Sequence, residues 1–353
     1  MQARWIEHVL EPQFELGTSK GPINARTVWY LLAWNNDRPD VIGIGEAALF
    51  PGHSKEFPAD VRTKLLELCN DTTNWDERLN TDLVAVPGVR FAVEQCLHDL
   101  EAGGSKILFP STFTLGQQGI PINGLVWMGD KSTMRTRIRE QIEKGSRCIK
   151  MKIGAIGIED ELDLLRSVRE EYNAADLTLR VDANGAFNMQ NVRPVLDALA
   201  SLEIHSIEQP IAPGLIESMT ELCADTPLPI ALDEDLIGMG HIDLKQDLLD
   251  TVKPQFIVIK PSLAGGWKAT REWIDAAQER GIGWWITSAL ESSIGLNAIV
   301  QFTATLGVQM PQGLGTGRVY RNNIPSPLVP TAGHLYYRPE LEWDLSTING
   351  RKN

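Results

Sequence analysis

The sequence predicts an α/β protein in which a modified TIM-type (β/α) barrel follows a small N-terminal α+β capping domain. Up to about residue 110, strand-like runs come before helical ones; after it, short apolar runs alternate with amphipathic segments. The tail after Pro325 is rich in proline and aromatic residues. We therefore assign residues 1–110 to the capping domain and 111–319 to the barrel. We expect residues 320–353 to fold back and complete the cap.

The first region contains the elements of an α+β domain. Residues 26–34 and 40–46 are rich in apolar and β-branched residues, and the turn-forming segment 35–39 separates them. Helical patterns follow at 58–70 and 88–101. Strands followed by helices, without alternation, favour a separate domain over part of a barrel.

The second region repeats a strand and a helix every 22–30 residues. The strand candidates are 121–127, 148–153, 178–182, 205–208, 229–232, 256–260 and 283–287, with a weaker eighth at 312–315. Helical segments include 157–172, 189–202, 267–280 and 292–306. Eight such units close a barrel, whereas fewer leave an open doubly wound sheet. Because the eighth strand is weak, the open sheet remains an alternative. No GxGxxG motif opens a helix after the first strand, so a dinucleotide site is less favoured.

Composition limits the classes of partner. The chain has 353 residues, 43% of them hydrophobic and 22% charged, which is typical of a globular protein with a large core. The net charge of −13 argues against nucleic acid and anionic membranes as partners. The four cysteines form no CxxC pair, and we find no apolar run long enough to span a membrane and no signal peptide. We expect a cytoplasmic protein, whose oligomeric state the sequence does not reveal.

The strand at 148–153 carries two lysines on one face. Lys150 and Lys152 alternate with apolar residues, and side chains two apart share a face of a strand. If the apolar residues face the helices, both ammonium groups point into the barrel. Alone, such a pair is more often solvated.

The next four strands each end on a charged residue: Asp182, Glu208, Asp233 and Lys260 follow Lys152 at steps of 25 to 30 residues. One such acid alone more often caps a helix. Together they bring five charges to one rim, and burying charges is costly unless they pair or bind a metal. Three carboxylates favour Mg²⁺, with Mn²⁺ possible, and the lysines supply bases on two sides. This arrangement suits abstraction of a proton α to a carboxylate, with the metal stabilising the enediolate.

These motifs, in this order, resemble the muconate-lactonizing subgroup of the enolase superfamily. The matching segments are Lys150-Met-Lys152, Val181-Asp182-Ala-Asn184-Gly, Ile207-Glu208-Gln-Pro210, Leu232-Asp233-Glu234 and Ile259-Lys260-Pro261. The resemblance implies that Asp182, Glu208 and Asp233 bind Mg²⁺ and that Lys152 is the acid/base catalyst. It also implies that Lys260 faces Lys152 across the substrate, that Lys150 tunes Lys152 and holds the substrate carboxylate, and that Asn184 and Glu234 support the ligands.

Within the subgroup, three loops resemble those of the o-succinylbenzoate synthases of menaquinone biosynthesis. They are Gly17-Thr18-Ser19-Lys20-Gly21, Phe50-Pro51-Gly52-His53-Ser54 and Thr287-Ser288-Ala289-Leu290-Glu291-Ser292-Ser293. The implied reaction is dehydration of 2-succinyl-6-hydroxy-2,4-cyclohexadiene-1-carboxylate to o-succinylbenzoate. We expect Ser19, Ser288, Glu291 and Arg180 to help bind this small anionic substrate.

Other activities remain open at this point. An N-acyl amino acid racemase of the same subgroup would use Lys152 and Lys260 as its two bases, and a muconate-type cycloisomerase is a further alternative. Dipeptide epimerases carry Asp-x-Asp after the eighth strand, whereas residues 312–317 contain no carboxylate. A barrel that has lost catalysis and serves only in binding is disfavoured, because no ligand or base of the motif set is missing.

Overall fold

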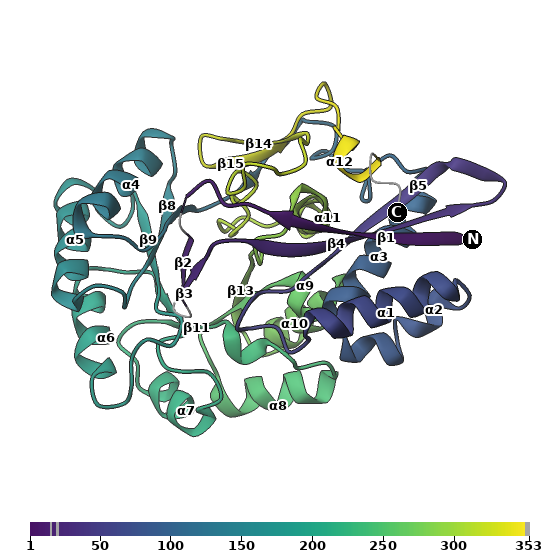
Figure 1. The fold of residues 1–353 in the computed structure, drawn as a ribbon. Coiled ribbons are helices and arrows are strands. Elements are labelled where there is room, and N and C mark those ends of the chain that lie inside the picture. The colour runs from purple at the N-terminus through teal and green to yellow at the C-terminus, as the bar shows by residue number, and fades with distance from the viewer. Residues whose placement is uncertain (15, 19–20, 350–353) are drawn as a thin grey trace.

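The computed structural model describes residues 1–14, 16–18 and 21–349, and its N-terminal region is an antiparallel sheet backed by helices (Figure 1). The sheet has the strand order β1-β4-β5, and a β2–β3 hairpin extends from it toward the barrel. The strands are β1 (Gln2–Leu10), β2 (Leu16–Thr18), β3 (Gly21–Ile23), β4 (Arg26–Asn35) and β5 (Arg38–Ala48). The helices are α1 (Pro58–Asn70), α2 (Trp75–Arg78), the short 3₁₀ helix η1 (Asp82–Ala85) and α3 (Pro87–Glu101).

The second region is a curled parallel sheet of seven strands in the order β13-β12-β11-β10-β9-β8-β7. These strands are β7 (Gly124–Val126), β8 (Cys148–Lys152), β9 (Thr178–Asp182), β10 (Ser206–Glu208), β11 (Ile230–Leu232), β12 (Phe256–Ile259) and β13 (Gly283–Ile286). Parallel bridges from Ile122 to Gln312 and from Thr287 to Gly313 join the two edges. The weak eighth strand therefore exists only as a short segment that closes the sheet. The predicted modified TIM-type barrel is thus confirmed, with seven regular strands and this short closing segment.

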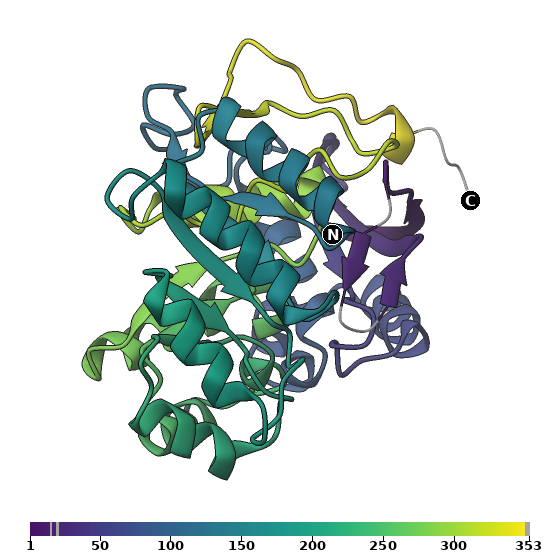
Figure 2. The ribbon, with the colours of Figure 1, turned by 90° about the vertical axis from the view of Figure 1, so that its left-hand side faces the viewer.

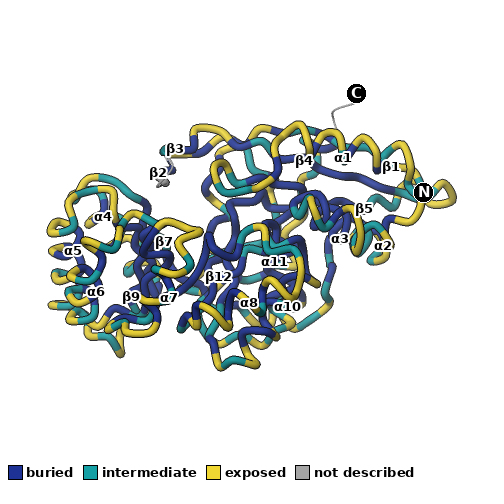
Figure 3. The backbone as a smooth tube through the Cα atoms, turned by 90° about the horizontal axis from the view of Figure 1, so that it is seen from below, coloured by how far each residue is buried: buried dark blue, intermediate teal, exposed yellow. Residues whose placement is uncertain are grey.

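Helices cover the outside of this sheet, because each has one apolar face. In α5 (Ile158–Glu171), for example, the buried Leu162, Leu165 and Val168 recur at the spacing of a helix and pack on the strands. The remaining elements of the region are α4 (Lys131–Glu143), α6 (Val192–Ser201), α7 (Ile216–Ala224), η2 (Glu234–Leu236), α8 (Ile242–Val252), α9 (Pro261–Ala264), α10 (Trp267–Glu279) and α11 (Ser293–Ala304). Figure 3 shows the exposed turns of α5 and α6 facing outward from buried strands.

No helix follows the closing segment: residues 314–345, all of them described, are non-helical. They contain β14 (Leu328–Thr331) and β15 (His334–Tyr337), which pair with each other, and β15 also pairs with β6 (Ile120–Pro121). The short α12 (Ser346–Asn349) follows them. Figure 2 shows this segment, in yellow, crossing the top of the molecule. An extended segment thus occupies the place where the eighth helix of a regular barrel would lie.

Hydrophobic packing joins the tail to the N-terminal sheet. Ile6 and Tyr30 of that sheet share a cluster with Tyr320, Ile324 and Ile348 of the tail. These contacts support the predicted return of residues 320–353, while the domain boundaries themselves stay a prediction. Within the described residues, no helix has the length and apolar character needed to cross a membrane.

The sequence predictions are confirmed for most elements of the barrel. The predicted strands at 148–153 and 178–182 match β8 and β9 within one residue, and the predicted helix at 58–70 matches α1. β1 was not predicted, because its residues carry charges at positions 4, 7 and 8. The β14–β15 hairpin was also missed, because the prolines of the tail suggested irregular chain.

Candidate active site

The inward face of β8 carries the two lysines. All five residues of β8 are buried, and Ile149 and Met151 pack into the apolar cluster between the sheet and the helices. Because side chains alternate along a strand, Lys150 and Lys152 point to the opposite face, into the barrel. Both line a pocket at the carboxyl ends of the strands.

Each lysine contacts carboxylates of neighbouring strands. Lys150 Nζ lies 2.7 Å from Glu208 Oε2 and 3.2 Å from Asp182 Oδ2. Lys152 Nζ lies 3.0 Å from Asp182 Oδ2 and 2.5 Å from Asn184 Oδ1. Burial opposes the charge on Lys150, but Glu208 and Asp182 outweigh it and hold the pKa of Lys150 above its usual value. Likewise burial disfavours ionised Asp182, yet Lys152 and Lys150 hold the pKa of Asp182 well below its usual range.

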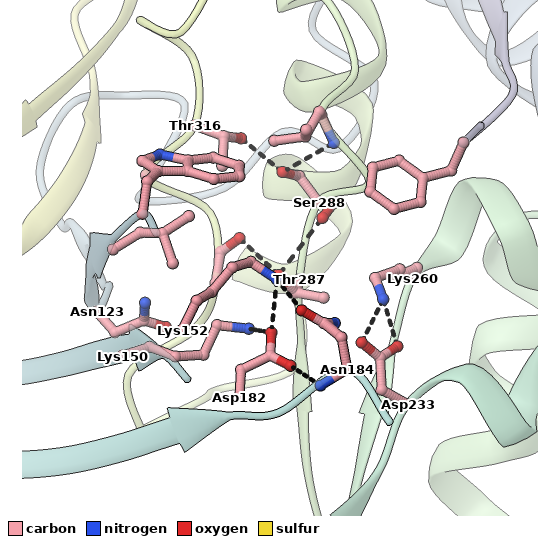
Figure 4. A pocket seen from close by; sticks show the side chains of 16 residues that line it. Asn123, Lys150, Lys152, Asp182, Asn184, Asp233, Lys260, Thr287, Ser288 and Thr316 are labelled. Atoms are coloured by element: carbon pink, nitrogen blue, oxygen red, sulfur yellow. Dashed lines mark hydrogen bonds and ion pairs between the residues drawn. The ribbon is translucent and has the colours of Figure 1, made fainter. Parts of the chain in front are cut away.

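Lys260 stands on the other side of the pocket. Its ammonium group donates to both carboxylate oxygens of Asp233, and Figure 4 shows this pair opposite Lys150 and Lys152. Burial lowers the pKa of Lys260, but the adjacent Asp233 and Glu234 raise it by more, so the pKa of Lys260 lies above its usual value. Lys152 and Lys260 therefore approach one small volume from two sides.

The three carboxylates lie on adjacent strand ends, although ammonium groups separate them. Within the described ranges, no group of three or more His, Cys, Asp or Glu side chains is drawn together closely enough to hold a metal ion. Glu208 is fully buried, its Oε1 has no hydrogen-bond partner, and burial raises the pKa of Glu208 to about 7 despite the nearby Lys150. A buried, unpaired carboxylate oxygen beside two further carboxylates has the hard donor chemistry that Mg²⁺ prefers. In donor chemistry, though not in their present spacing, these three carboxylates therefore fit a divalent cation.

Asn184 and Glu234 connect these groups to one another. Asn184 Nδ2 donates to Glu234 Oε1 at 2.9 Å while Asn184 Oδ1 accepts from Lys152. His53 of the cap lies 3.8 Å from the same Glu234 oxygen. Burial raises the pKa of Glu234 to about 7, and the charge of Asp233 adds to that effect. Asn184 thus links the Lys152 side of the pocket to the Asp233 side.

The pocket itself has a volume of about 60 Å³. Besides the charged residues, its lining includes Phe50 of the cap and the hydroxyl-bearing Thr287, Ser288 and Thr316. Ser288 Oγ lies 2.5 Å from Thr316 Oγ1. Ser288 therefore lines the pocket, and its predicted contact with the substrate stays a prediction.

Four of the described predicted residues do not line the pocket: Glu208 and Glu234, which lie behind its charged lining, and Arg180 and Glu291. Arg180 is 1% exposed, donates to Pro311 O at 2.9 Å and lies over the Trp285 ring at 4.1 Å. Because Arg180 precedes Asp182 by two residues, it shares the inward face but lies deeper in the barrel. Glu291 is buried and accepts hydrogen bonds from Ala289 N and Ser262 Oγ, so it fixes the loop that bears Ser288. Ser19 lies outside the described residues.

Sequence reasoning missed the groups that hold the charged residues in place. Gln209 Oε1 accepts from Asp233 N at 3.1 Å, while Gln209 Nε2 donates to Asp235 Oδ2 at 2.7 Å. Glu161 accepts from three backbone amides of the loop after Lys152, beginning with Gly154 N at 2.8 Å. The position of Gln209 directly after Glu208 was the available signal, whereas Glu161 resembled an ordinary acid in the first turn of a helix.

The comparisons with known proteins agree with this site. Residues 133–340 match the family model "Enolase C-terminal domain-like". An o-succinylbenzoate synthase from Desulfotalea psychrophila is 40% identical, covering 90% of this chain and 94% of the relative. The chain belongs to the enolase superfamily.

Further relatives within the superfamily are similar in fold and in sequence. The crystal structure of MenC from Desulfotalea psychrophila superposes with a TM-score of 0.83 at 37% identity, covering 95% of this chain and 99% of that one. A hydrophobic dipeptide epimerase from Roseobacter litoralis is 25% identical, covering 84% of this chain and 86% of the relative. Enzymes of the enolase superfamily use a divalent metal ion, for which the carboxylates described above are the available donors.

Proposed function

We propose that this enzyme dehydrates 2-succinyl-6-hydroxy-2,4-cyclohexadiene-1-carboxylate to o-succinylbenzoate, a step of menaquinone biosynthesis. The observation that carries the proposal is the approach of Lys152 and Lys260 to one carboxylate-rich pocket from two sides. The 40% identity to an o-succinylbenzoate synthase supports this reaction over others of the superfamily.

Lys152 is the proposed acid/base catalyst. Its neutral amine removes the ring proton α to the carboxylate, and the electron pair of the broken C–H bond moves into that carboxylate. When the pair returns, the C–O bond to the ring hydroxyl breaks. Lys152 gives its proton to the departing hydroxyl, so water leaves and the ring becomes aromatic. Asn184 supports this role by holding Lys152 Nζ at 2.5 Å.

The remaining charges stabilise the anion that forms between these two proton transfers. Mg²⁺ held by Asp182, Glu208 and Asp233 would supply positive charge to the substrate carboxylate. Lys260 contributes a second positive charge from the opposite side, and Lys150 keeps Asp182 and Glu208 in position through its two ion pairs. A preorganised positive environment of this kind favours the transition state over the neutral-ring ground state.

The direct test is turnover of the precursor by the purified protein. With Mg²⁺ present, ultraviolet absorbance should report formation of o-succinylbenzoate, and excess chelator should abolish it until Mg²⁺ is restored. Failure to turn over the precursor in the presence of Mg²⁺ or Mn²⁺ contradicts the proposal. We also propose a cytoplasmic location, which the four unpaired cysteines support.

Racemisation of N-acyl amino acids is the second candidate, because Lys260 lies where a second base would be needed. An N-succinyl-L-Arg/Lys racemase from Bacillus cereus is 26% identical over 63% of this chain. Exchange of the α-proton in D₂O, followed by NMR, would reveal this activity. Exchange without turnover of the cyclohexadiene precursor would make racemisation the principal function.

A further inference from the structure

The reaction pocket is too small for the whole proposed substrate. Its volume is about 60 Å³, whereas an apolar cavity of about 150 Å³ is what benzene alone occupies in a protein interior. The substrate has a six-membered ring of that size and, in addition, a succinyl arm that ends in a second carboxylate. Part of the substrate must therefore extend beyond the pocket.

A larger cavity adjoins the pocket and offers the space. Its volume is about 790 Å³, and it runs along α4 between that helix and residues 315–319 and 330–333. It lies where no helix follows the closing segment of the barrel. The two cavities share five lining residues: Asn123, Leu125, Trp127, Gly315 and Thr316. Figure 4 shows Asn123 and Thr316 on the side of the pocket away from Lys260 and Asp233.

The charged lining of this cavity is positive in a protein that is strongly negative. Arg137, Lys144 and Arg318 line it together with a single carboxylate, Glu140, while the whole chain has a net charge of −13. Glu140 lies 3.5 Å from Lys144. Neither arginine has a carboxylate partner among the described residues: Arg137 donates to the carbonyls of Trp127 and Met128, and Arg318 is exposed without a hydrogen bond or ion pair. Neither arginine is thus neutralised by a carboxylate, and Arg318 is available to an external anion.

The junction of the cavities holds an unused polar atom. Asn123 is 5% exposed, and its Nδ2 donates to Gly124 O at 3.2 Å. Its Oδ1 is buried and has no hydrogen-bond partner. A buried acceptor without a donor is unfavourable unless a ligand or water supplies one. Asn123 Oδ1 thus marks a polar junction between the two cavities, where a water molecule can supply the missing donor; the succinyl arm itself carries only acceptors.

We propose that the larger cavity is a second anion-binding compartment, in which Arg318 binds the distal carboxylate of the substrate's succinyl arm. This inference rests on the proposed function, because it assigns the two ends of the same dicarboxylate to two compartments. The ring and its carboxylate occupy the lysine-lined pocket, and the arm passes Asn123 and Thr316 into the arginine-lined cavity. Arg137 adds positive charge but also holds the chain at Trp127, so Arg318 is the cleaner position to test.

The test is Arg318→Gln, compared with Arg135→Gln. Arg135 is an exposed arginine of α4 that does not line either cavity, so this control removes the same charge without touching the compartment. In Arg318→Gln we expect KM for the precursor to rise about tenfold, since a charge-assisted contact is lost, while kcat changes less than about twofold. Arg135→Gln should leave both constants unchanged.

Two inhibitors separate arm binding from ring binding. Inhibition by o-succinylbenzoate, which has the arm, should weaken about tenfold in Arg318→Gln, whereas inhibition by benzoate, which lacks it, should not change. Equal weakening of both inhibitors, or of neither, overturns the compartment. If wild-type protein does not turn over the precursor, the proposed function fails. Calorimetric binding of o-succinylbenzoate and benzoate to the two variants then decides the compartment by the same pattern.

Discussion

Buried carboxylates lie in two regions of this protein, the pocket and the contact between cap and barrel, and the groups that they contact differ between the two. In the pocket, Asp182 and Asp233 face ammonium groups. At the contact between cap and barrel, Glu46 of β5 accepts from Ser292 N, Ser292 Oγ and Gly295 N at the start of α11, and Glu94 of α3 accepts from Trp267 N at the start of α10. The first set is paired with lysine side chains that line the pocket, where a metal or substrate would bind. The second is fixed to backbone amides, so it serves structure rather than chemistry.

The largest effect should come from the pocket. Lys152→Ala removes the proton-transfer group, and we expect kcat/KM for the precursor to fall by about 10²- to 10⁴-fold. Thermal unfolding should change little by comparison, because Lys150 still pairs with Asp182. Lys131→Ala, on the outer surface of α4, is the matched control and should leave the rate unchanged. A near-normal rate in Lys152→Ala would remove Lys152 from the mechanism.

The cap contact should affect stability more than chemistry. Glu46→Ala leaves three buried donors at the start of α11 without an acceptor, and we expect the free energy of unfolding to fall by about 2–4 kcal/mol. Urea titration followed by circular dichroism measures this free energy of unfolding. Asp250→Ala, which breaks an exposed pair with Arg280, should lose much less. Equal losses in the two variants would show that Glu46 is not a special anchor.

The effect confined to part of the pH range concerns Glu94. Burial raises the pKa of Glu94 to about 7 from an ordinary value of 4.5, while its amide contacts only partly oppose that shift. The folded protein therefore keeps the Glu94 proton that the unfolded chain releases, so this contribution to stability is complete below about pH 4.5 and is lost as the pH rises to about 7. The side chain in Glu94→Gln cannot ionise, so this variant should not lose stability as the pH rises. Its free energy of unfolding should therefore exceed that of wild type by up to about 3 kcal/mol between pH 5 and pH 8.

Urea titrations across that pH range measure the Glu94 effect. Glu101→Gln, an exposed position on the same helix, is the control and should follow the wild-type curve. Parallel curves for wild type and Glu94→Gln would mean that Glu94 is ionised in the folded protein throughout this range. Glu94 would then differ less from the pocket carboxylates than we infer.

The sequence predicted the pocket residues but not the carboxylates at the contact between cap and barrel. The positions of Lys152 and Asp182 depend on strand alternation and on the length of one strand–helix unit, both of which are local patterns. Glu46 and Glu94 could not be assigned, because their partners lie 173 or more residues away along the chain. Arg180 was predicted to help bind the substrate, but it is buried against Pro311 and Trp285, because alternation along a strand gives the face of a residue and not its depth within a barrel. The loop at 287–293 was predicted as one unit, whereas Ser288 lines the pocket and Glu291 only supports it.

The missing eighth helix also affects how the chain can be altered. Its place is filled by a segment that belongs at once to the closing edge of the barrel, through β6 and β15, and to the packing of the N-terminal sheet, through Tyr320 and Ile324. The first and last parts of the chain are therefore interlocked. Trimming the chain from Tyr320 onward would loosen the cap and the barrel seam together. Swapping the cap between related enzymes would require transferring this tail with it.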